Sequence, residues 1–302
     1  MAGSLFITGG SGFIGRRLLS RLDLRDYEHV FCLSRRPSAE IASLAETNLT
    51  WMQGSLLDSS SYAHSLDDNT TVVHMAAMTG KAPAENHFAV NRDATQHLLR
   101  LCRERQVRRF LHMSSIAVSF RDTSNYSYAQ SKLESEELVR KSGLNFVIIR
   151  PTIVLGRESP AWQSLSQLAR LPWVPVFGDG SAKIQPIDVD DLVDSMVTLI
   201  GEKEFRGDTY EIGGPDVLTM EEFLRKVHRL YCANEARVWH VPYQPVKALL
   251  ACAEKFAFSW MPISAGQLSA FVQDSIVTDS PFYTQQRPRM KDLDTVLRQL
   301  AQ

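Results

Sequence analysis

The chain has 302 residues, of which 44% are hydrophobic and 22% are charged, and its formal net charge is −1. These values are ordinary for a globular protein and leave room for one large domain with a smaller one beside it. A nearly neutral chain has no overall field that would attract nucleic acid or an anionic membrane, so we expect neither as a partner.

Targeting, metal and redox signals are weak throughout the sequence. The N-terminus lacks a basic stretch followed by an apolar one, and no apolar run approaches the ~18 residues that a membrane span needs. The four cysteines form no CxxC pair, and the histidines form no HxH or HExxH pattern. We therefore expect a soluble protein of the reducing cytoplasm, without a secretion signal, a membrane span or a bound metal.

The first half of the chain alternates short apolar runs with amphipathic segments. The apolar runs, each predicted to be a strand, cover residues 4–8, 29–33, 49–52, 71–77, 109–114 and 145–150. Helical spacing of apolar residues predicts helices over residues 13–24, 85–105 and 126–141. Strands that are apolar on both faces and alternate with helices indicate a parallel sheet covered on both sides. The pattern predicts an α/β fold with a doubly wound parallel sheet, the Rossmann arrangement.

After Pro151 the periodicity is less regular and prolines accumulate. We assign the predicted helix at 188–200 and the predicted strand at 209–212 to the sheet. The helices predicted at 220–231 and 245–256 are assigned to a smaller domain that caps it. The sequence therefore predicts a dinucleotide-binding domain of residues 1–151 and 187–212, and a C-terminal α/β substrate domain of residues 152–186 and 213–302.

The stretch TGGSGFIG, residues 8–15, follows the first predicted strand and opens the first predicted helix. Its spacing satisfies GxGxxG. In this context the glycines permit a sharp turn, the approach of a pyrophosphate and close packing of helix on sheet. Main-chain amides and the helix dipole then hold the phosphates. We expect a dinucleotide here, with contacts from Gly9, Gly10, Ser11, Gly12, Phe13, Ile14 and Gly15.

The second predicted strand ends in LSRRP, without the acidic residue that grips the adenosine ribose of NAD. Ser34, Arg35 and Arg36 stand there instead, and guanidinium groups suit bidentate binding of a phosphate. We therefore favour NADP(H), which carries a 2′-phosphate, over NAD(H). Two solvated loop arginines are the alternative interpretation.

Tyr128 and Lys132 lie four residues apart in a predicted helix and so share one of its faces. A neighbouring ammonium favours the phenolate and lowers the phenol pKa from its usual ~10. The tyrosine could then exchange a proton with a substrate oxygen near neutral pH, while Ser115, at a predicted strand end, hydrogen-bonds the same oxygen. Tyr126 is not a candidate, because its partner four residues on is Gln130, which brings no charge. An exposed Tyr–Lys pair without chemistry is the alternative.

Several segments together resemble the extended, epimerase-like branch of the short-chain dehydrogenase/reductases. They are TGGSGFIG at 8–15, HMAA at 74–77, VNRDATQHLL at 90–99, YAQSK at 128–132, RPTIVLG at 150–156 and QPIDVDDLV at 185–193. The resemblance covers roughly residues 4–215. It implies that Tyr128 is the acid/base, that Lys132 also holds the nicotinamide ribose, and that Ser115 orients the substrate oxygen. It further implies that Asn91 supports a water-linked proton path.

The resemblance also implies cofactor contacts beyond the glycine turn. These would come from Ser55, Leu56, Met75, Ala76, Ala77, Pro151 and Ile153, and from Tyr128 and Lys132. Three positions depart from the family pattern: Ser55 replaces a common Asp, Leu155 a common aromatic residue, and Asp188 the usual His. The residues after Ser115 also lack the Asp–Glu pair of sugar-nucleotide dehydratases, which argues against dehydration.

These observations lead us to expect an NADP(H)-dependent oxidoreductase that acts on a small carbonyl or alcohol compound. A nucleotide-sugar epimerase with a retained NAD is one alternative. A structural or regulatory NADPH-binding protein is another, because the layout of residues 241–279 resembles the atypical branch that includes a mitochondrial complex I accessory subunit. Extended members of the family often pair through two helices of the sheet domain, so a homodimer is a further expectation.

Overall fold

The structure is a computed structural model, and it describes residues 3–36, 48–261 and 263–301. The chain divides into two compact units. Unit 1 consists of Met1–Ser114, Ser131–Arg150 and Val193–Tyr210. Unit 2 consists of Ser115–Gln130, Pro151–Leu192 and Glu211–Gln302. Within the described part of the chain, no helix has the length and apolar content that crossing a bilayer requires.

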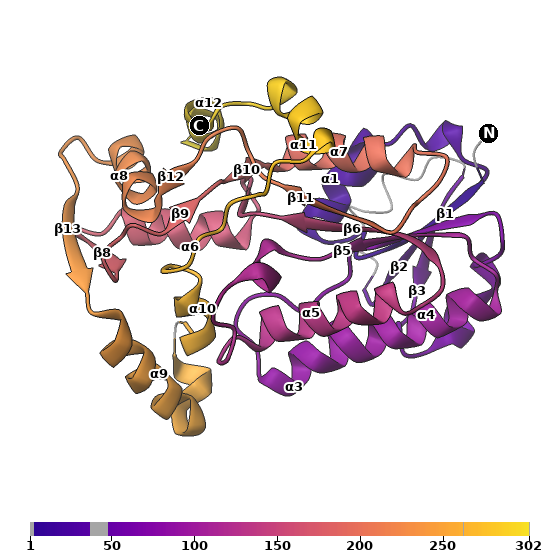
Figure 1. The fold of residues 1–302 in the computed structure, drawn as a ribbon, viewed down its shortest axis with the longest axis horizontal. Helices are drawn as coiled ribbons and strands as arrows, with labels where there is room; N and C mark the ends of the chain where they lie inside the picture. The colour runs from indigo at the N-terminus through magenta and orange to yellow at the C-terminus, as the bar shows by residue number, and fades with distance from the viewer. Residues whose placement is uncertain (1–2, 37–47, 262, 302) are drawn as a thin grey trace. The chain divides into compact units, whose positions relative to one another are not determined.

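Unit 1 is built on a seven-stranded sheet with the strand order β11-β6-β5-β4-β1-β2-β3 (Figure 1). Its strands are β1 (Ser4–Thr8), β2 (Val30–Ser34), β3 (Leu49–Gln53), β4 (Thr70–His74), β5 (Arg109–Met113), β6 (Asn145–Pro151) and β11 (Asp208–Ile212). From β6 to β3, neighbouring strands pair in parallel. Since the order reverses beside β1, the sheet is doubly wound, which confirms the predicted fold class.

Helices cover both faces of this sheet (Figure 1). One face carries α1 (Phe13–Arg21) and α7 (Val189–Ile200), and the other carries α4 (Ala94–Glu104) and α5 (Ser127–Arg140). Apolar side chains of α4 and α5 pack with those of β1, β4, β5 and β6 in one buried cluster. Every residue of β1 and β4 is buried, so neither strand shows the alternation of apolar and polar residues that a sheet exposed on one face would have.

The helix predicted at 85–105 contains a π-helical turn. The short helix α3 (Ala84–His87) leads into this turn, Phe88–Asp93, and α4 follows directly. Such turns are rare and often accompany functional sites. Two other predicted boundaries are wrong. Helix α1 stops at Arg21, because the backbone of Leu22 is extended, and β4 stops at His74 rather than continuing to residue 77.

Unit 2 has its own buried core. Helices α6 (Pro160–Ala169), α8 (Met220–Tyr231) and α12 (Leu293–Ala301) contribute to it, as does β8 (Trp173–Phe177), which pairs in parallel with β13 (Arg237–Val241). The other elements of this unit are β7 (Val154–Leu155), β9 (Lys183–Ile184), β10 (Ile187–Asp188), β12 (Leu218–Thr219), α9 (Tyr243–Ala257), α10 (Ala265–Ser269) and α11 (Pro281–Gln286). The sequence predicted α8 and α9 but missed the rest.

Candidate functional site

The glycine-rich stretch forms the turn between β1 and α1. Gly9 has a φ of +75°, and a Cβ there would lie 2.7 Å from the main-chain nitrogen of Ala76. A Cβ at Gly15 would overlap the carbonyl oxygen of Gly9 and lie 2.6 Å from the Cα of Gly10. Both positions therefore require glycine. Gly12 is the N-cap of α1 and offers no capping side chain, and the amides of a helix's first turn are natural ligands for an anion.

The carboxyl end of β2 lies beside this turn. The buried Ser34 hydroxyl lies 3.2 Å from the Ser11 hydroxyl and accepts from the Arg36 amide at 3.3 Å. Both Arg35 and Arg36 are exposed to solvent. The arginines therefore stand next to the glycine turn with their side chains in solvent, where an anionic group could reach them.

The other predicted cofactor residues of unit 1 follow strands of the same sheet. Ser55 and Leu56 come after β3, and residues 75–77 come after β4. Ser55 is exposed, and Leu56 is half-buried and packs against the core of unit 1. Because these strands are parallel to β1, their carboxyl ends lie at the same sheet edge as the glycine turn. Pro151 and Ile153, at the end of β6 and just beyond it, belong to unit 2.

Asn91 lies in the π-helical turn and is only 1% exposed. Its side-chain oxygen accepts from the Met78 amide at 2.7 Å, and its nitrogen donates to the Met78 carbonyl oxygen and to the Ser131 hydroxyl, each at 3.0 Å. Asn91 thus fixes the main chain just beyond β4 and contacts the residue that precedes Lys132.

Lys132 is buried in unit 1, with 2% of its side chain surface exposed. Its ammonium donates to the carbonyl oxygen of Met113, the last residue of β5, at 2.5 Å. Burial lowers the pKa of Lys132 to about 8, against the opposing effect of the Glu136 carboxylate. Arg140 and Arg150 in turn hold Glu136, at 2.9 and 2.7 Å.

Ser115 and Tyr128 belong to unit 2 and hydrogen-bond to each other through their side chains. Burial raises the pKa of the Tyr128 hydroxyl, and the bond to Ser115 opposes this rise. The lowered pKa predicted from the sequence is therefore wrong for this structure. The physical reason is that burial outweighs the hydrogen bond, while the Lys132 ammonium donates to a main-chain carbonyl. Helix α5 carries Tyr128 and Lys132 one turn apart, as predicted.

The carboxylates at the start of α7 have a partner that sequence reasoning missed. Asp188 accepts from the Asp190 amide at 3.0 Å and so caps the N-terminus of α7. The Lys291 ammonium lies 2.8 Å from Asp188 and 3.2 Å from Asp190, and the Lys291 amide donates to Asp191. Because about a hundred residues separate the partners, no local pattern could have indicated the contact.

A family model for the NAD dependent epimerase/dehydratase family matches residues 5–213. The chain is 29% identical over 268 residues to the UDP-glucose 4-epimerase of Vibrio cholerae, which is 80% of this chain and 79% of that protein. It is 25% identical to NADH dehydrogenase (ubiquinone) 1 alpha subcomplex subunit 9 of Dictyostelium discoideum over 226 residues, a stretch that covers 72% of this chain. It spans only 61% of that subunit, and 63% of an uncharacterized relative from Sinorhizobium fredii.

Among solved structures, the chain resembles a double mutant of the dTDP-glucose 4,6-dehydratase DesIV from Streptomyces venezuelae, determined with NAD bound. The TM-score is 0.67 at 25% identity, over 79% of this chain and 84% of that one. The strand order, the glycine turn and the family model, which covers more than half of the sequence, agree with one another. The chain belongs to the NAD-dependent epimerase/dehydratase family of extended short-chain dehydrogenase/reductases.

Proposed function

We propose that the chain is an NADP(H)-dependent oxidoreductase that interconverts a small carbonyl compound and its alcohol. The proposal is carried by the hydrogen bond between the side chains of Ser115 and Tyr128. Helix α5, which begins with Ser127 and Tyr128, also bears the buried Lys132. A nicotinamide cofactor supplies or accepts the hydride in such a reaction. Unit 1 would bind this dinucleotide at the carboxyl edge of its sheet.

The protein's own side chains would then manage the proton. Because the pKa of Tyr128 is raised, its hydroxyl carries a proton at neutral pH and can donate it to a substrate oxygen as that oxygen gains negative charge. Ser115 would orient the same oxygen by a hydrogen bond. Burial lowers the pKa of Lys132 to about 8, and its ammonium donates to the Met113 carbonyl oxygen.

The preference for NADP(H) is proposed from Arg35 and Arg36, which are exposed at the end of β2, the strand whose last residue bonds to the glycine turn. We expect Arg35→Ala to weaken NADPH binding roughly 10- to 100-fold, because charge-assisted hydrogen bonds to the 2′-phosphate would be lost. NADH affinity should stay the same. Fluorescence titration of both dinucleotides measures this, with Arg108→Ala, an exposed arginine elsewhere in unit 1, as control. Equal affinity of the wild-type protein for NADPH and NADH would contradict the proposed preference.

A nucleotide-sugar epimerase with a retained NAD is the second candidate, and the similarity to the Vibrio cholerae epimerase favours it. Such an enzyme oxidises and re-reduces one carbon and does not release its cofactor between the two steps. Denaturing the purified protein and identifying the released nucleotide separates the two candidates. Stoichiometric NAD in the supernatant would support the epimerase and contradict the proposed NADP(H)-dependent reductase.

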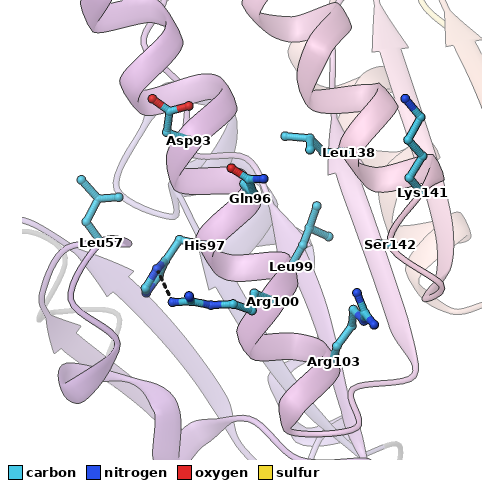
Figure 2. Close-up of a pocket in the computed structure, with 10 residues that line it drawn as sticks. All are labelled: Leu57, Asp93, Gln96, His97, Leu99, Arg100, Arg103, Leu138, Lys141 and Ser142. Atoms are coloured by element: carbon cyan, nitrogen blue, oxygen red, sulfur yellow. Dashed lines mark hydrogen bonds between the residues drawn. The ribbon is translucent and has the colours of Figure 1, made fainter.

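Pairing of two copies through α4 and α5 is part of the proposal. A groove of about 590 Å³ on unit 1 runs beside these helices and includes Leu99 and Leu138 (Figure 2). Asp93 lies toward one end of the groove and Arg103 toward the other. A two-fold axis across the helices would place Asp93 of one copy opposite Arg103 of the second. We expect a dimer by sedimentation equilibrium at micromolar concentration, and a monomer there would contradict this pairing.

A further inference from the structure

A buried chain of hydrogen bonds in unit 1 runs from the end of β1 to the π-helical turn. The Thr8 hydroxyl lies 2.7 Å from Nδ1 of His74, and Nε2 of His74 lies 2.8 Å from the Thr95 hydroxyl. At one end Thr8 accepts from the Ala76 amide at 3.2 Å, and at the other Thr95 donates to the Asn91 carbonyl oxygen at 2.7 Å. Thr8, His74 and Thr95 are each at most 1% exposed.

The number of available protons fixes the direction of every bond in this chain. A hydroxyl has one proton, and Thr95 gives its proton to the Asn91 carbonyl, so Thr95 must accept from His74. Nε2 of His74 therefore carries the hydrogen. Burial and the nearby Lys132 lower the pKa of His74 to about 3, so the ring is neutral and its Nδ1 is an acceptor. Thr8 then donates to Nδ1 and remains free to accept from the Ala76 amide.

The buried hydrogen-bond chain and the Asn91 side chain together hold residues 75–78, the segment after β4, at two points. Thr8 binds the Ala76 amide, while the Asn91 side chain binds both the amide and the carbonyl of Met78. The main-chain carbonyl of Asn91 is the last acceptor of the chain, so His74 connects the two points through the protein interior. Gly9 of the cofactor turn also approaches the Ala76 nitrogen closely. A shift of this segment would therefore disturb the glycine turn.

We propose that His74 is a positioning residue which, as the neutral Nε2–H tautomer, fixes residues 75–78 in the conformation that binds the dinucleotide. The inference rests on the proposed function, which places the dinucleotide at this sheet edge. The opposite tautomer would set the Nε2 lone pair of His74 against the lone pairs of Thr95, whose only proton is already donated. His74 itself need not touch the dinucleotide.

Two substitutions at Thr8 test the hydrogen-bond chain: one removes the Thr8 hydroxyl and the other keeps it. Valine matches threonine in shape but lacks the hydroxyl, whereas serine keeps the hydroxyl. We expect Thr8→Val to bind NADPH and NADH about tenfold more weakly, because the Ala76 amide and His74 each lose a buried partner. Thr8→Ser should stay within about twofold of the wild-type affinity. Urea unfolding shows whether both variants fold. Thr95→Val and Thr95→Ser form a second pair that tests the other end of the chain.

The tautomer is measured directly in the wild-type protein, independently of any activity. The imidazole ¹⁵N shifts of His74, assigned by comparison with His74→Gln, should show a protonated Nε2 and an unprotonated Nδ1 at neutral pH. A protonated Nδ1 would overturn the chain as described. Folded Thr8→Val and Thr95→Val proteins that bind dinucleotides as the wild type does would overturn the positioning role alone. A wild-type protein that binds neither dinucleotide would overturn the proposed function, and the positioning role with it.

Discussion

Tyr128→Phe is expected to lower kcat about a thousandfold, since general acid catalysis by a placed side chain contributes about 10²- to 10⁴-fold. Phenylalanine keeps the ring on α5 and removes only the hydroxyl that bonds to Ser115. The rate is measured as NADPH or NADH oxidation, with whichever carbonyl compound the wild-type protein reduces fastest in a panel.

Tyr126→Phe provides the matched control for this experiment. The centroid of the Tyr126 ring lies 5.7 Å from that of the Tyr128 ring. Each substitution therefore removes one phenolic hydroxyl, from neighbouring rings. Tyr126 has no cationic residue one turn along the helix, and its substitution should leave kcat nearly unchanged. A comparable fall in kcat in both variants would show that the fall in Tyr128→Phe comes from disturbed packing rather than from the lost acid. An active Tyr128→Phe protein would refute the acid/base assignment.

Gly15→Ala is expected to lower the free energy of unfolding by about 3 kcal/mol, because the added methyl group overlaps rigid main chain. The new Cβ would meet the Gly9 carbonyl and the Gly10 backbone, neither of which can rotate away as a side chain could. Relieving the overlap moves the start of α1 away from β1. Because the amides proposed to hold the pyrophosphate are at that helix end, dinucleotide affinity should fall as well. Urea unfolding and fluorescence titration measure the two effects.

Gly201→Ala is the control for the effect on stability of replacing a glycine of unit 1 with alanine. Gly201 is exposed, and a Cβ there would approach only carbonyl oxygens, at 3.5 Å, which is an ordinary contact. Its stability should stay within about 0.5 kcal/mol of the wild type. A Gly15→Ala protein as stable and as tightly binding as Gly201→Ala would mean that the turn does not require a bare backbone at position 15.

The sheet domain was predictable because its strands are short and apolar on both faces. β1, β2, β3, β5 and β6 all lie within one residue of the predicted ranges. The glycine turn was predictable for another reason: its constraint is local, since Gly15 must avoid main chain only five and six residues away. Where sequence neighbours determine the conformation, the sequence alone was sufficient.

Features that depend on distant contacts were not predictable. Helix α6 was missed although Ser159 caps it and Pro160 begins it, because its apolar face packs chiefly against α8, some sixty residues later. The raised pKa of Tyr128 depends on the part of its ring that the folded chain shields from water. The tautomer of His74 follows from hydroxyls that come from β1 and α4. None of these partners is local in sequence.

The most direct test of the account is equilibrium titration of the wild-type protein with NADPH, NADP⁺, NADH and NAD⁺. We expect saturable binding with one site per chain, tightest for NADPH. A folded protein, freed of any co-purified nucleotide, that binds none of the four at millimolar concentration would contradict the claim that the edge beside the glycine turn is a dinucleotide site.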